Sequence, residues 1–87
     1  MNFEVGKVIV LANDEEYVIV SIAEYNSKKY FYLINAKLND VMFAYLDNDE
    51  IVKIDNIDEL NEVMPLLSNN IQKYLQQVTK KNSEDNN

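Results

Sequence analysis

Only two residues, Asn26 and Ser27, separate two stretches that are rich in β-branched and aromatic residues, 17–25 and 28–36. Residues of these types lose side-chain freedom in a helix and pack well on the pleated surface of a sheet. Two such stretches joined by a two-residue loop predict a tight β-hairpin, in which Tyr25 lies opposite Lys28. We therefore expect the fold to be built around an antiparallel pair of strands.

The hairpin also predicts which side chains share a face, because successive side chains of a strand point to opposite sides of the sheet. One face carries a tyrosine-rich set: Tyr17, Ile19, Ser21, Ala23, Tyr25, Lys28, Tyr30, Tyr32 and Ile34. The other carries a purely apolar set: Val18, Val20, Ile22, Phe31 and Leu33. A slip of one residue would mix the two sets, so their separation supports this register. A small antiparallel sheet usually has one polar face, and this pair of strands has none, which raises the question of what covers its second side.

Three further strands are expected, at residues 5–11, 41–47 and 50–55. Each is rich in valine, isoleucine or aromatic residues, and the segments between them contain the Asn and Asp residues that favour tight turns. Five strands in succession imply an antiparallel meander.

From Asn56 onward the apolar residues follow a helical period instead. Asn56 and Glu59 have the spacing of a capping box, and acidic residues are favourable near the positive end of a helix. The apolar stripe consists of Leu60, Val63, Met64, Leu67, Ile71, Leu75 and Val78. Because a proline inside a helix costs about 3 kcal/mol, we predict a break or kink at Pro65, with a second helical segment beginning there.

The expected fold class is α+β: a five-stranded antiparallel β-meander followed by a C-terminal helix, or a pair of helical segments, packed on one sheet face. We expect one domain over residues 1–79 and a disordered polar tail over 80–87. The apolar stripe of the helix is predicted to cover the purely apolar set of the hairpin.

Composition excludes most catalytic chemistry. The 87 residues include no cysteine, histidine, tryptophan or arginine, and Gly6 is the only glycine. No histidine-assisted nucleophile, histidine or thiolate zinc site or glycine-rich phosphate loop can therefore be built. The segment 47–50 begins like a calcium loop, but Ile51 and Val52 stand where a ligand and a glycine are required. We expect no enzyme activity, no catalytic residue, no cofactor and no bound metal.

The charge balance restricts the class of partner. Fifteen carboxylates against eight lysines give a net charge of −7, which disfavours contact with nucleic-acid phosphates. The sequence contains no apolar stretch near the roughly 20 residues that a membrane helix needs. We therefore expect a cytoplasmic protein that binds neither nucleic acid nor membrane.

Two surfaces are candidates for binding another protein. The tyrosines Tyr17, Tyr25, Tyr30, Tyr32 and Tyr45 form either an interface or residues at the edge of the core, since tyrosine can bury its ring and keep its hydroxyl in water. The second candidate is an acidic surface of Asp47, Asp49, Glu50, Asp55, Asp58, Glu59 and Glu62, for which an ordinary solvated face is the simpler interpretation.

These surfaces support two hypotheses about function. The first is a non-enzymatic interaction or adaptor module that uses the tyrosine-rich face to bind a protein partner or a second copy of itself. The alternative is a small acidic inhibitor, encoded on a mobile element, that mimics nucleic acid and blocks a basic groove on a nucleic-acid enzyme.

The order of predicted elements is a strand and an acidic turn, a long strand, a short turn, a tyrosine-containing strand, two more strands and an acidic helix start. These elements lie in residues 8–60, VIVLANDEEYVIVSIAEYNSKKYFYLINAKLNDVMFAYLDNDEIVKIDNIDEL. This arrangement resembles the YrzB-like family of small acidic bacterial proteins of unknown function, over roughly residues 8–67. The resemblance implies an α+β domain of unknown activity and transfers no functional residue.

Overall fold

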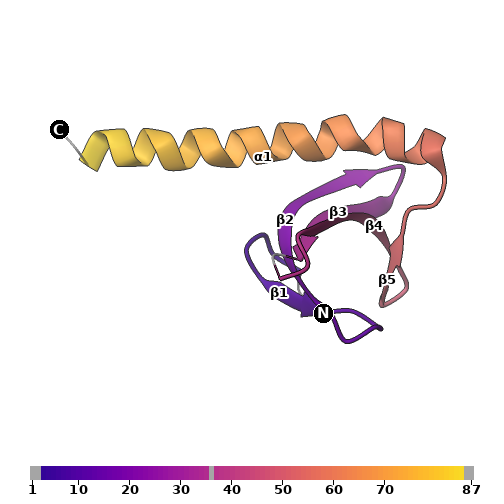
Figure 1. Ribbon diagram of the computed structural model, residues 1–87. Helices are drawn as coiled ribbons and strands as arrows, with labels where there is room; N and C mark the ends of the chain where they lie inside the picture. The colour runs from indigo at the N-terminus through magenta and orange to yellow at the C-terminus, as the bar shows by residue number, and fades with distance from the viewer. Residues whose placement is uncertain (1–2, 36, 86–87) are drawn as a thin grey trace.

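In the computed structural model, five antiparallel strands form one curled sheet that is followed by a single helix (Figure 1). The described residues are 3–35 and 37–85, with side chains described as far as Ile71. The elements are β1 (Val8–Val10), β2 (Glu16–Tyr25), β3 (Lys28–Asn35), β4 (Asp40–Asp47), β5 (Glu50–Lys53) and α1 (Ile57–Asp85). The strands follow one another in the sheet in chain order, so the predicted α+β meander is confirmed.

The two-residue hairpin between β2 and β3 is confirmed. Tyr25 lies opposite Lys28, and Asn26 and Ser27 have φ angles of 52° and 63°. Two successive positive φ angles are typical of the type I′ turn, whose twist matches that of the strands it joins. Asparagine adopts a positive φ more readily than serine does. The pairing of β2 with β3 therefore imposes this φ angle on Ser27.

A β-bulge in β2 changes the predicted faces beyond the first half of the hairpin. The pairing runs as predicted from Tyr25 to Ser21, and then shifts so that Val20 is unpaired and Ile19 lies opposite Leu33. One extra residue on one strand reverses the alternation that follows it. The prediction that Tyr17 and Ile19 share the tyrosine-rich face is therefore wrong, because both are buried with Phe31 and Leu33 on the opposite face.

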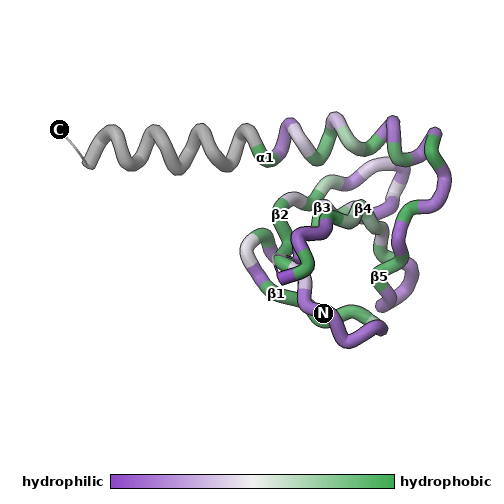
Figure 2. The backbone as a smooth tube through the Cα atoms, viewed as in Figure 1, coloured by the Kyte–Doolittle hydropathy of each residue, from purple (hydrophilic) through white to green (hydrophobic). Residues whose placement is uncertain are grey.

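The inner face of the curled sheet holds the first core. Its buried members are Tyr17, Ile19, Phe31, Leu33 and Ala44, and the side chains packed around them include Phe3, Ile9, Leu11, Ile22, Met42, Leu46 and Ile51. The ring of Phe3 contacts that of Phe31 edge to face, with centroids 5.2 Å apart. Figures 1 and 2 show that the sheet curls round on itself, and the packing of these side chains buries its inner apolar face.

The helix packs on the outer face, and the prediction that it covers the apolar set is wrong. The second core contains Ala23, Tyr30, Ile54, Val63 and Leu67, flanked by Tyr25, Tyr32, Phe43, Tyr45 and Leu60. Two hydrogen bonds join α1 to β2: Ser21 Oγ donates to the Leu67 carbonyl at 2.8 Å, and Asn70 Nδ2 donates to the Ile22 carbonyl at 2.7 Å. The tyrosine-rich face is the better partner for the helix because the curl of the sheet leaves it on the outside.

The helix begins after Asn56, as predicted, but it continues through Pro65, where a break is predicted. Asn56 Oδ1 accepts the backbone N–H groups of Asp58 at 2.9 Å and Glu59 at 3.1 Å, which satisfies two free donors of the first turn. However, α1 is one continuous helix through Pro65, so the predicted break and second segment are wrong. Val63 and Leu67, which lie on either side of the proline, are both fully buried against the sheet. Their packing favours one continuous helix over a break at Pro65.

The second half of α1 extends beyond the sheet (Figure 1). The helix has 29 residues and is therefore about 43 Å long. It includes the segment from residue 80 to Asp85, where a disordered tail is predicted, while residues 86–87 lie outside the described residues. No change of structure marks residue 79, so the domain boundary proposed there stays a prediction.

Candidate protein-interaction surface

Tyr30 is the centre of the tyrosine-rich set and is covered by the chain's own helix. Its side chain is 2% exposed, and its hydroxyl donates a 2.5 Å hydrogen bond to Glu59 Oε2. Lys28 Nζ lies 3.3 Å from the same oxygen, so strand β3 and the first turn of α1 are joined by a phenol, a carboxylate and an ammonium group. In a capping box, the Glu59 side chain accepts a hydrogen bond from the backbone N–H of Asn56. Here the Glu59 side chain instead accepts a hydrogen bond from Tyr30 on the sheet.

The electrostatics of this contact favour a protonated phenol beside an ionised carboxylate. Burial, with the hydrogen bond and negative charge of Glu59 as further causes, raises the pKa of Tyr30 to about 12. The hydrogen bond from Tyr30, aided by Lys28, lowers the pKa of the Glu59 carboxyl below its ordinary value. Tyr30, Lys28 and Glu59 therefore form a structural link between β3 and α1.

The other four tyrosines do not form one free surface. Tyr17 is buried in the inner core, where its hydroxyl donates to Asp40 Oδ2 at 3.2 Å and burial raises its pKa. Tyr25, Tyr32 and Tyr45 are half-buried around the second core. Lys28 Nζ lies 4.2 Å from the centre of the Tyr45 ring, a cation–π contact. The structure therefore favours the interpretation of these tyrosines as core and core-edge residues.

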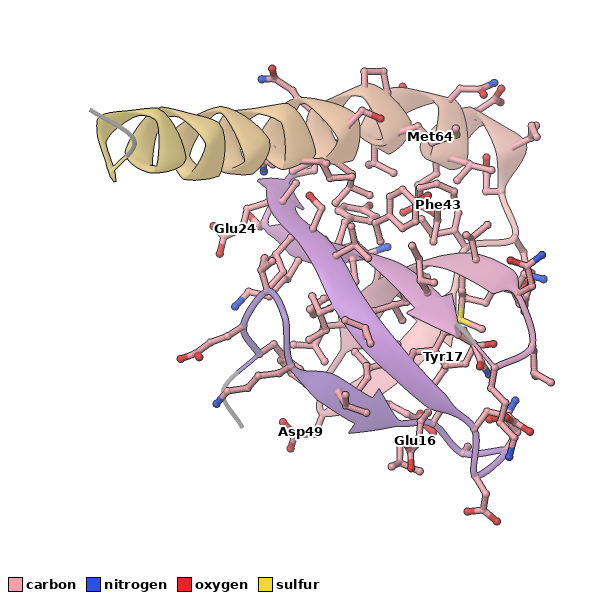
Figure 3. All side chains as sticks on the ribbon, turned by 60° about the vertical axis from the view of Figure 1, so that its left-hand side comes forward. Glu16, Tyr17, Glu24, Phe43, Asp49 and Met64 are labelled. Carbon is pink, nitrogen blue, oxygen red and sulfur yellow. The ribbon has the colours of Figure 1, made fainter. Side chains whose placement is uncertain are left out.

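The seven predicted carboxylates lie in two groups at opposite ends of β5. Asp47, Asp49 and Glu50 belong to the β4–β5 turn, whereas Asp55, Asp58, Glu59 and Glu62 surround the start of α1. Figure 3 shows Asp49 at the far end of the sheet from the helix that carries Met64. Glu59 is also engaged by Tyr30 and Lys28. The structure does not gather these side chains into one acidic surface.

An exposed apolar row, which the sequence does not predict, crosses four strands on the outer face. Val8 lies opposite Val18, Val18 opposite Ile34, and Ile34 opposite Val41. Val8 is 55% exposed, Val18 37% and Val41 52%, and Ile34 is half-buried. We call these four residues the open face, because they continue the outer face of the sheet past the part that α1 covers.

The bulge explains why the sequence conceals the open face. Without it, Val18 falls on the same side as Phe31 and Leu33 and away from Ile34. With it, Val18 and Ile34 become direct neighbours on the outer face. A bulge with no glycine leaves no signal in the sequence, so strand patterning could identify the four residues as apolar but could not bring them together.

A shallow hollow of about 300 Å³ adjoins the open face. Its lining consists of Val8, Val18, Ile34, Asp14, Glu15, Glu16, Asn35 and Lys37. The buried side chain of Asn35 donates to Glu15 Oε2 at 3.2 Å, and the Glu15 backbone N–H donates to Asn13 Oδ1 at 3.0 Å, so the carboxylate of Glu15 is held in place. The hollow thus combines an aliphatic floor with a rim of three carboxylates and one lysine.

Two other kinds of feature, a metal site and a membrane-spanning helix, are absent from residues 3–35 and 37–85. Within these residues, no group of three metal-ligating side chains is placed to hold an ion, and no helix is both long and apolar enough to cross a membrane. Comparisons with protein-family models, with curated proteins and with solved structures find no significant match to the chain. The resemblance to the YrzB-like family therefore stays a prediction.

Proposed function

We propose that this protein is a non-enzymatic interaction module that binds a protein partner through the open face. The observation that carries the proposal is the continuous row from Val8 to Val41, which is exposed whereas Tyr30, on the same outer face, is buried beneath α1. Apolar residues scattered singly over a surface are ordinary, whereas these four are direct neighbours across four strands and adjoin a polar rim, an arrangement that suits the binding of a small apolar segment.

This proposal keeps the function expected of the tyrosine-rich face but moves it to a different part of the sheet. Tyr30 packs under α1, so a partner could reach it only if the helix moved away. The alternative function, an acidic inhibitor that mimics nucleic acid, requires the predicted carboxylates on one surface. Their division between the two ends of β5 gives that alternative no support.

Site-specific photo-cross-linking in the cells that produce the protein tests the proposal. A benzophenone side chain is placed at position 41 in the open face or, as a matched control, at position 66, where Leu66 is an exposed apolar residue on α1. We expect a discrete adduct from position 41 and none from position 66. The adduct should be lost in the Val18→Thr variant, which keeps the β-branched shape but makes the row more polar.

The proposal fails if position 41 gives no adduct, if position 66 gives the same adduct, or if Val18→Thr leaves the yield unchanged. Thermal unfolding of each variant, followed by circular dichroism, confirms that a lost adduct reflects lost contact and not lost folding.

A further inference from the structure

From the open face and its acidic rim we infer the class of partner: a short apolar segment that carries lysine or arginine, with the cation seated among Asp14, Glu15 and Glu16. This inference rests on the proposed function and goes beyond it by specifying the ligand. Three observations carry it: the charge of the rim, the size of the apolar row and the position of Glu16 beside that row.

The rim of the hollow is acidic on balance. Its charged side chains are Asp14, Glu15, Glu16 and Lys37, and the chain as a whole has a net charge of −7. A second copy of the chain would bring the same carboxylates against these, which is unfavourable. A segment with lysine or arginine would instead place opposite charge there and lay its aliphatic stem on the valines.

The size of the row favours a short segment over a folded partner. Four strands span roughly 14 Å across the sheet, since neighbouring strands lie about 4.8 Å apart. The row is only one or two residues deep along the strands, so its footprint is on the order of 100 to 200 Å², far below the roughly 800 Å² per partner of a stable interface between folded proteins. A few residues of an extended peptide are enough to cover it.

The apolar and acidic parts are close enough for one side chain to touch both. Glu16 precedes Val18 by two residues on β2 and lies opposite Val10, so it projects from the same outer face. Residues two apart along a strand are roughly 7 Å apart, which is about the length of an extended lysine or arginine side chain. A basic residue can therefore contact Val18 with its stem and Glu16 with its charge.

Selection from a library of short linear peptides displayed on phage tests the inference on the full-length protein. The parent protein is the target, and the Val18→Thr/Val41→Thr double variant is used for counter-selection. We expect enriched sequences that combine valine, isoleucine or leucine with lysine or arginine. A synthetic enriched peptide should bind the parent several-fold more weakly at high than at low ionic strength, because its charged contacts are exposed to solvent.

Two single variants of β2 isolate the contribution of the rim. Glu16→Gln should weaken the synthetic peptide about twofold to fivefold, the range of an exposed ion pair, and Glu24→Gln should leave binding unchanged. Both glutamates are exposed on the same strand, and Figure 3 shows them toward its opposite ends. The comparison therefore controls for the loss of one negative charge.

The adverse outcomes distinguish the inferred ligand class from the proposed function. Enriched peptides without basic residues, or equal binding by Glu16→Gln and the parent, would overturn the inferred ligand class and leave the proposed function intact. A second adverse outcome is a cross-link from position 41 together with a failure to select any peptide whose binding depends on Val18 and Val41. That outcome would also overturn the inferred ligand class, in favour of a folded partner. A dimer of the parent in light scattering that the double variant loses would show that the open face binds a second copy instead.

Discussion

At the scale of single residues, the contact of Tyr30 with Glu59 shows how one hydroxyl joins the sheet to the helix. The phenol ring belongs to the second core, and the hydroxyl reaches the first turn of α1, where it donates to Glu59. The Glu59 carboxylate is also close to the positive end of the helix, which favours its charge. Sequence alone places Glu59 in a capping box, whereas the structure assigns its side chain to Tyr30 and Lys28.

We expect the free energy of unfolding to fall as the pH rises from about 10 to about 12, and the Tyr30→Phe variant to show a smaller fall. The pKa of Tyr30 is raised to about 12 in the folded protein, above the value of about 10 for an unfolded chain. The unfolded state therefore loses its proton first, so the stabilisation is complete below pH 10 and is lost as the pH passes through the folded value.

Urea denaturation of the parent and Tyr30→Phe across this pH range measures the effect. At neutral pH the variant should lose about 1.5 to 3 kcal/mol, the usual net contribution of a hydrogen bond to a charged group. Parallel curves for the two proteins above pH 10 would show that Tyr30 does not carry the dependence.

At the scale of elements, the first half of α1 packs on the sheet and the second half extends beyond it (Figure 1). Val63 and Leu67 are fully buried on the outer face of the sheet, while Leu66, between them, is exposed. The helical period predicts Leu60, Val63 and Leu67 correctly as contact residues, but Met64 of the predicted stripe is exposed, and the side chains of Leu75 and Val78 lie outside the described ones. The period also does not predict which face of the sheet receives the helix. The packing on either side of Pro65 overrides the local preference for a break.

Leu67→Ala should destabilise the fold by about 2 to 5 kcal/mol, because it leaves a cavity between α1 and the sheet. The neighbouring Leu66→Ala should change stability by less than about 0.5 kcal/mol, since that side chain is exposed. Chemical denaturation of both variants gives the comparison, and similar losses from the two would contradict the packing of α1.

Replacing Pro65 by alanine should stabilise the protein by about 1 to 3 kcal/mol. Alanine restores the backbone N–H that proline lacks and removes the clash with the preceding turn. Thermal unfolding measures the gain. A helix that really began at Pro65 would gain nothing, because proline is favourable in the first turn, so an unchanged melting temperature would favour the break predicted from sequence.

At the scale of the whole molecule, one sheet separates two cores and leaves one part of its outer face bare. The inner core is enclosed by the curl, the second core lies beneath α1, and the open face lies under neither. The molecule extends 46 Å along its longest axis and 28 and 25 Å along the others, an asymmetry to which the projecting half of the helix contributes (Figure 1).

The Val18→Thr/Val41→Thr double variant should keep its stability within about 1 kcal/mol of the parent, because both side chains are exposed and threonine retains the β-branched shape. Leu33→Ala, in the fully buried inner core, should cost about 2 to 5 kcal/mol. Calorimetry of both variants tests whether the open face contributes to folding. A large loss in the double variant would assign the row a structural role.

Most elements of this protein can be predicted from local sequence patterns. Period-two patterns and turn residues predict the strands, Asn26 and Ser27 predict the hairpin between Tyr25 and Lys28, and Asn56 predicts the start of the helix. These features depend on neighbours within a few residues, so local preference is enough to specify them. Most of the fold class follows from them.

Which surfaces are covered depends on contacts between segments that are distant in the sequence. The unpaired Val20 reversed the faces of β2, the curl enclosed the apolar face, and α1 therefore covered Tyr30 and left Val18 exposed. These outcomes depend on how distant segments share the available apolar surface, a balance of burial that no local pattern records. The five tyrosines predicted as a possible interface are core and core-edge residues for that reason, and the open face is the candidate binding surface.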